Sequence, residues 1–105
     1  MSVPILSTLG TLTSAGVTNF ANSSESYNAV FQVTVTSIGT NVVVRLEGSL
    51  DATNWFNLNS ANTDSTITAN GTYGYSLMQA PVPYLRGRLV SISTGTPTVV
   101  FKVFA

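Results

Sequence analysis

Few side chains in this sequence could carry out chemistry, because charged residues make up only 8% of it. Histidine and cysteine are both absent, which excludes Ser-His-Asp and Cys-His nucleophilic centres and the usual zinc ligand sets. The carboxylates are Glu25, Glu47, Asp51 and Asp64. Glu47 and Asp51 share one face of a predicted strand, but ~13 Å of strand separates them, which is too far for a glycosidase pair. We therefore expect a protein that is not an enzyme, with no catalytic residue and no cofactor.

The stretch Asp51-Ala52-Thr53-Asn54 offers a weak candidate for a calcium site, because Asp and Asn side chains supply the oxygen ligands that calcium prefers. The same residue types form turns, since their side chains bond nearby backbone groups and tolerate unusual backbone angles. We favour the turn and expect no metal site.

The cations Arg45, Arg86 and Arg88 all fall on predicted strands near the centre of a sheet. Two interpretations stay open: the arginines pair with Glu47 or Asp51, or they are contacts to an acidic partner surface.

The single tryptophan, Trp55, follows the polar turn at 51–54 and precedes Phe56. Together with the tyrosines it could form a platform on which a sugar stacks. We expect instead that Trp55 is a core anchor, because large aromatic side chains dominate the burial of small domains.

Alternation of apolar and polar residues predicts strands along most of the chain, and no segment shows a helical period. Short connections rich in Gly, Asn and Ser between these segments predict hairpins, with Asn70-Gly71 the strongest turn signal. The sequence therefore predicts an all-β fold, an antiparallel β-sandwich or a jelly-roll-like arrangement. The predicted strands cover residues 27–38, 42–50, 55–58, 66–68, 72–78, 84–92 and 98–104, with turns at 37–41, 51–54, 70–71 and 93–97.

The length of 105 residues indicates a single core, which we divide into an N-terminal segment, 1–26, and a β-sandwich domain, 27–105. The N-terminal segment is either an arm that reaches a neighbour or an edge strand followed by a loop. Val3, Ile5 and Leu6 are its candidate partner contacts. We expect that deletion of residues 1–10 leaves the sandwich folded.

The formal net charge is zero and no basic run occurs, so we expect no nucleic-acid partner. No apolar run is long enough for a membrane-spanning helix, and the first residues lack the basic region of a signal peptide. These features predict a protein that is made and used inside a cell, or assembled there into a particle. Low charge usually weakens solubility, so it favours a chain that exists mainly within an assembly, although secreted β-proteins can share this composition.

Two stretches resemble small structural proteins of tailed bacteriophages. Residues 44–55, Val-Arg-Leu-Glu-Gly-Ser-Leu-Asp-Ala-Thr-Asn-Trp, are similar to an "EGS-x-D-G-T-N-W" pattern, with Ala52 in place of the commoner Gly. Residues 84–88, Tyr-Leu-Arg-Gly-Arg, with the turn and strand that follow, are similar to the later part of the same pattern. The resemblance implies a capsid decoration (cement) protein: a homotrimeric β-sandwich on the capsid surface of the virion, bound to the major capsid protein and assembled in the host cytoplasm. Some relatives belong to the tail or neck instead.

The turn at residues 49–55 also resembles the "S-x-D-G-x-x-W" turn of discoidin-like sandwiches. That resemblance implies a carbohydrate-binding module, the alternative to a virion protein.

Overall fold

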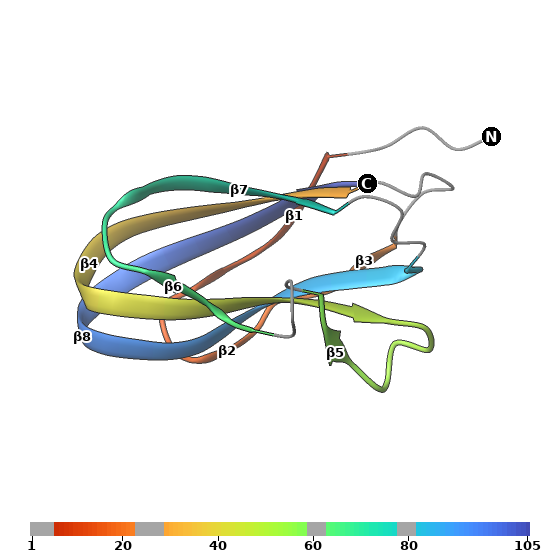
Figure 1. Cartoon of the computed structure of the whole chain (residues 1–105), viewed down its shortest axis with the longest axis horizontal. Coiled ribbons are helices and arrows are strands. Elements are labelled where there is room, and N and C mark those ends of the chain that lie inside the picture. The colour runs from red at the N-terminus through yellow and green to blue at the C-terminus, as the bar shows by residue number, and fades with distance from the viewer. Residues whose placement is uncertain (1–5, 23–28, 59–62, 78–81) are drawn as a thin grey trace.

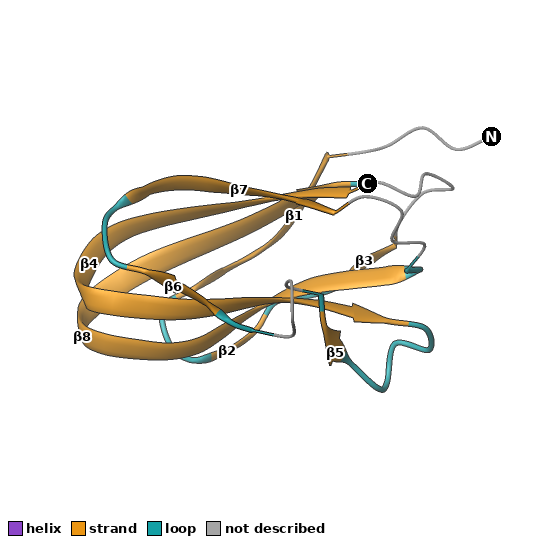
Figure 2. Ribbon diagram, in the orientation of Figure 1, coloured by secondary structure: helices purple, strands orange, loops and turns teal. Residues whose placement is uncertain are grey.

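The computed structural model describes residues 6–22, 29–58, 63–77 and 82–105. These residues form an 8-stranded antiparallel sheet without a helix (Figure 1, Figure 2). The predicted all-β, antiparallel sandwich is confirmed. Within the described ranges, no helix is long and apolar enough to cross a membrane. The strands are β1 (Leu6–Leu12), β2 (Gly16–Val17), β3 (Ala21–Asn22), β4 (Ala29–Ser49), β5 (Phe56–Asn57), β6 (Ser65–Ile67), β7 (Gly71–Leu77) and β8 (Tyr84–Phe104).

The two longest strands, β4 and β8, have 21 residues each and organise the fold. They pair antiparallel along almost their whole length, from Val30 opposite Phe104 to Ser49 opposite Tyr84. Both strands run through the segments 37–41 and 93–97 that the sequence predicts as turns. The hairpin predicted at 37–41 is wrong, and the turn predicted at 93–97 does not reverse the chain, because each segment bends one continuous strand.

The bend is built from strained and closely packed residues of both strands. Ser37 and Thr94 have φ values of 56° and 59°, and Gly95 has 78°, all in the left-handed region. A Cβ on Gly39 would lie 2.6 Å from the carbonyl carbon of Thr94, so only glycine fits this crossing. The backbone N–H of Thr40 donates a 2.9 Å hydrogen bond to Thr94 Oγ1. The bend therefore carries β4 and β8 together from one layer of the sandwich into the other (Figure 1).

Each layer combines one half of β4 and one half of β8 with two edges. In the first layer, β7 pairs with residues 29–35 of β4 and β1 pairs with residues 99–104 of β8. In the second layer, β6 and β5 pair with residues 42–48 of β4, while β2 and β3 pair with residues 84–89 of β8. The β4–β5 pairing confirms the hairpin predicted around residues 51–54.

The predicted hairpin at Asn70-Gly71 is also wrong, because β6 and β7 do not pair with each other. β6 and β7 each pair with β4, one in each layer, so the chain crosses between layers at this turn. Asn70 Oδ1 accepts a 2.9 Å hydrogen bond from the backbone N–H of Ile38. Asn70 therefore links the segment between β6 and β7 to the bend of β4.

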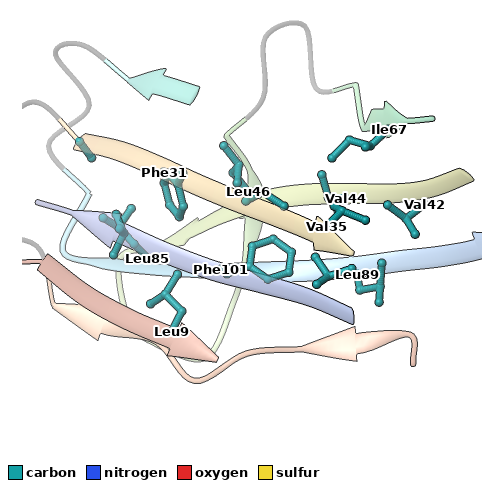
Figure 3. Close-up of a cluster of buried hydrophobic side chains, with 14 of the residues drawn as sticks. Leu9, Phe31, Val35, Val42, Val44, Leu46, Ile67, Leu85, Leu89 and Phe101 are labelled. Atoms are coloured by element: carbon teal, nitrogen blue, oxygen red, sulfur yellow. The ribbon is translucent and has the colours of Figure 1, made fainter. Parts of the chain in front are cut away.

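The core lies between the two layers and follows the predicted alternation (Figure 3). Leu50 continues the alternation of Val42, Val44 and Leu46, but it is 70% exposed because β4 ends at Ser49. Phe101 packs directly over Gly87, where a Cβ would lie 2.6 Å from Phe101 Cγ. Burial of each large apolar side chain contributes about 1.5–3 kcal/mol relative to leaving it exposed. The side chains that are 0–2% exposed include Phe31, Val33, Val35, Val42, Val44, Leu46, Leu85, Leu89, Val99, Phe101 and Val103.

The N-terminal residues that the structure describes belong to both layers. β1 lies along β8 with a β-bulge between Thr8 and Gly10, and Leu9 is only 3% exposed. Deletion of residues 1–10 would remove a paired strand and a core side chain, so we now expect it to destabilise the sandwich instead of leaving it intact. The candidate contacts Val3 and Ile5 lie outside the described residues, whereas Leu6 begins β1 and is 63% exposed.

Candidate functional site

The charged side chains gather on the outer face of the second layer. The register of β4 and β8 sets Glu47 opposite Arg86 and Arg45 opposite Arg88. Directly opposed residues of an antiparallel pair point to the same side of the sheet, and here their neighbours along each strand point into the core. The sheet register thus assembles three arginines around one carboxylate.

Glu47 lies at the centre of this arginine–carboxylate network. Its oxygens accept hydrogen bonds from Arg86 Nε at 2.7 Å and from Arg88 Nε at 2.9 Å. Arg45 Nη1 lies 3.6 Å from Glu47 Oε2. The arginines cover the carboxylate so completely that only 3% of its side chain is exposed. Burial of a carboxylate is tolerated here because two charge-assisted hydrogen bonds satisfy it.

A second carboxylate extends the network toward the edge of the layer. Arg45 donates two hydrogen bonds to Asp64, Nε to Oδ1 at 2.7 Å and Nη2 to Oδ2 at 3.1 Å. Asn57 Nδ2 also donates to Asp64 Oδ1 at 3.0 Å. These hydrogen bonds, that of Arg45 above all, lower the pKa of Asp64, and the same bond raises the pKa of Arg45.

The charges of the arginine–carboxylate network nearly cancel one another. Three guanidinium groups and two carboxylates leave a formal charge of +1 on this face. The interpretation that the arginines pair with Glu47 agrees with the geometry, whereas Asp51 takes no part in these ion pairs. Arg45 and Arg88 keep side-chain exposures of 32% and 36%, so both can also touch a partner.

Asp51 instead closes the turn after β4. Its Oδ1 accepts hydrogen bonds from the backbone N–H groups of Asn54 at 2.8 Å and Thr53 at 2.9 Å, and from Ser49 Oγ at 3.0 Å. The Asn54 backbone donor is the largest of the causes that lower the Asp51 pKa. The side-chain oxygens of the turn therefore accept hydrogen bonds from within the turn itself. Among the described residues, no group of three or more acidic, histidine or cysteine side chains could hold a metal ion.

Trp55 is not a core anchor, and that prediction is wrong. Its ring lies outside the buried cluster, with the Arg86 guanidinium carbon 4.0 Å from the ring centroid. The capped turn at 51–54 brings Trp55 over the outer face, where a cation–π contact covers one side of the indole. Leu58, two residues after the 44%-exposed Phe56, packs against the core in its place, over Gly48.

An aromatic cluster forms at the end of the arginine–carboxylate network. Phe20, which is 50% exposed, lies 5.9 Å from Trp55 and 5.4 Å from Tyr84 between ring centroids. The Phe20–Tyr84 rings meet edge to face, a favourable aromatic geometry. Sequence analysis missed Phe20, because only the pairing of β3 with β8 brings the N-terminal segment beside Tyr84.

A separate apolar row crosses the outer face of the first layer. Leu6 and Val30 both lie opposite Phe104 in the register, one on each side of β8. The three side chains are 63%, 45% and 48% exposed, in the order Leu6, Val30, Phe104. Leu6, predicted as a partner contact, therefore belongs to a continuous exposed stripe.

Two solved structures match this chain over nearly all of its length. The crystal structure of the SPBc2 prophage-derived protein YomS matches with a TM-score of 0.63 and 13% sequence identity, covering 100% of this chain and 97% of that chain. A chain from the Bacillus endospore appendages, a family of disulfide-linked pili, matches at a TM-score of 0.41 and 12% identity, covering 98% of this chain and 83% of its own. No protein-family model and no curated protein matches the sequence. The similarity to YomS defines a shared β-sandwich fold.

Proposed function

We propose that this chain is a non-enzymatic structural protein of a tailed-bacteriophage virion, which decorates and stabilises the capsid as a homo-oligomer. The observation that carries the proposal is the structural match to a prophage-derived protein over 100% of this chain and 97% of that chain. The resemblance of residues 44–55 to phage structural proteins supports the same class. A trimer is the oligomer that this resemblance implies, and the major capsid protein is the partner.

The outer faces of the sandwich favour attachment through a large area of weak apolar and polar contacts, and not through a few charged contacts. The arginine–carboxylate network neutralises most of its own charge. The exposed apolar side chains Leu6, Val30 and Phe104 offer a surface that contact with a shell would cover. Symmetric copies would multiply modest single contacts into tight attachment.

Co-sedimentation of the purified protein with undecorated phage shells tests the proposal. Full-length protein is expected to pellet with shells, and the bound fraction should change little between 50 and 500 mM salt because few unpaired charges take part. Leu6→Ser with Phe104→Ser should weaken binding, whereas Thr36→Ser, an exposed change beyond the apolar row on the same layer, is the matched control. Protein that stays in the supernatant at every salt concentration, with head shells and with tail and neck assemblies, contradicts the proposal.

The aromatic cluster supports one second candidate, a carbohydrate-binding module. Phe20, Trp55 and Tyr84 gather on one exposed face, and rings of this kind stack on sugars. Binding on a glycan array that Trp55→Ala abolishes, without a change in far-ultraviolet circular dichroism, would select this function. An array without binding removes it.

A further inference from the structure

The four edges of the sandwich differ in how well they are protected against pairing with another strand. Exposed edges present unpaired backbone N–H and C=O groups, and proteins protect them by short strands, bulges, prolines or charges. In the second layer, β2, β3 and β5 have 2 residues each and β6 has 3. In the first layer, a bulge between Thr8 and Gly10 interrupts β1.

β7 has none of these protections. It is a 7-residue strand, Gly-Thr-Tyr-Gly-Tyr-Ser-Leu, without a charge or a proline. Its register with β4 is continuous from Ala29 opposite Leu77 to Val35 opposite Gly71. Among the described residues β4 is its only partner, and the strand lies along the upper margin of the molecule in Figure 1. β7 is thus the one long, regular and uncharged edge in the described part of the chain.

The sequence of β7 is complementary to itself. If two copies pair antiparallel about Gly74, Thr72 lies opposite Ser76 of the other copy, and Tyr73 lies opposite Tyr75. Thr–Ser and aromatic pairs are both favourable across antiparallel strands. In the single chain Tyr73 and Tyr75 are half-buried at the margin of the core, and Thr72 and Ser76 are exposed.

Gly74, the residue on the axis of this pairing, is not required by the single chain. A Cβ there would meet nothing within 4 Å, and the register passes it without a bulge. Glycine inside a strand weakens it and often marks the close approach of another backbone. A second copy of β7, paired at this edge, would supply that backbone.

We propose that β7 is a self-association strand, which pairs antiparallel with β7 of a second copy about a two-fold axis at Gly74. The pairing joins the first layers of two copies into one continuous sheet and extends the core through the tyrosines. A two-fold contact uses one β7 from each chain, so a three-fold contact elsewhere on the surface is compatible with it. The inference concerns self-association alone and does not depend on capsid binding.

Charge pairs at positions 72 and 76 test the inference directly. In the antiparallel register, Thr72→Lys with Ser76→Lys sets lysine opposite lysine twice, whereas Thr72→Glu with Ser76→Lys sets glutamate opposite lysine twice. Both variants change the same two exposed positions, so each is the matched control of the other. Like charges directly opposed across strands are destabilising and opposite charges are favourable.

Sedimentation velocity across a concentration series measures the outcome. The wild type and the Glu/Lys variant should self-associate with similar dissociation constants, and the Lys/Lys variant should be weakened by about tenfold or more at low salt. A 1:1 mixture of the Lys/Lys variant with a Thr72→Glu, Ser76→Glu variant should restore the dimer, which shows that both are folded. A wild-type chain that stays monomeric at every concentration overturns the inference. So do equal dissociation constants for the Lys/Lys and Glu/Lys variants, because another strand or surface then forms the contact.

Discussion

Replacement of Glu47 by Gln tests how much the arginine–carboxylate network contributes to stability. The carboxylate is 3% exposed and accepts one hydrogen bond from Arg86 and one from Arg88, at 2.7 and 2.9 Å. Glutamine keeps the shape, but its amide offers one acceptor oxygen and sets its NH₂ donor against the other guanidinium. One charge-assisted bond is therefore lost and the other is weakened.

The expected cost follows from these two bonds. A hydrogen bond to a charged group contributes about 1.5–3 kcal/mol, and loss of one partner of a fully buried pair costs about 3–5 kcal/mol. The arginine side chains are 16% to 36% exposed, so water screens the unpaired guanidinium groups and the value falls toward the lower end. We expect Glu47→Gln to lower the free energy of unfolding by about 2–3 kcal/mol.

Urea unfolding followed by the fluorescence of the single tryptophan provides the assay, because Trp55 lies on Arg86 of the same network. Asp64→Asn is the matched control, since the same chemical change falls on a carboxylate with 25% exposure and should cost about 1 kcal/mol or less. A Glu47→Gln protein within about 0.5 kcal/mol of the wild type would refute the reasoning. It would mean that the guanidinium groups find equivalent partners in water.

Asp64, Gly87 and Leu9 each support one further test of the described contacts. The hydrogen bond from Arg45 lowers the pKa of Asp64 in the folded state, so the unfolded chain binds more protons at Asp64 than the folded chain does. The ionised Asp64 therefore stabilises the fold above about pH 5, and this contribution is lost as the pH falls through the folded pKa. Urea midpoints measured from pH 7 to pH 2 should therefore fall more steeply below pH 5 in the wild type than in Asp64→Asn. Gly87→Ala should cost about 1–3 kcal/mol, because its Cβ collides with the fully buried Phe101, whereas Gly16→Ala meets nothing within 4 Å and should leave the thermal midpoint unchanged. Deletion of residues 1–10 should abolish cooperative unfolding or lower the stability by about 2–5 kcal/mol through loss of Leu9, whereas deletion of residues 1–5 removes no described contact; equal denaturant midpoints for the two deletions would contradict this.

The alternation of residue types was enough to predict most of the strand segments after residue 27 and the buried face of the longest ones. Phe31, Val33 and Val35, and again Val99, Phe101 and Val103, are buried as their alternation predicts. A period of two leaves little freedom, because a slip of one residue would expose every apolar side chain. The same local information predicted the Asp51 turn, since its hydrogen bonds join residues two or three positions apart in the chain.

Local signals did not decide whether the chain reverses within a layer or crosses to the other layer. The turn residues near Gly39, Asn70 and Gly95 all change the direction of the backbone, as their types predict. A hairpin and a corner can share this turn chemistry and differ only in which strand is available as a partner. That choice was made by the full-length pairing of β4 with β8, a contact between segments far apart in the sequence.

The candidate site was likewise decided by tertiary structure. The sequence identified Arg45, Arg86 and Arg88, but it could not tell that one buried carboxylate, Glu47, binds two of them and lies beside the third. The size of Trp55 predicted a place in the core, whereas in the structure the ring lies outside the core and the Arg86 guanidinium group covers one of its faces. The contacts of Glu47 and Trp55 with the arginines depend on the register between strands. The residues near a side chain in the sequence do not determine which residue of another strand will lie opposite it.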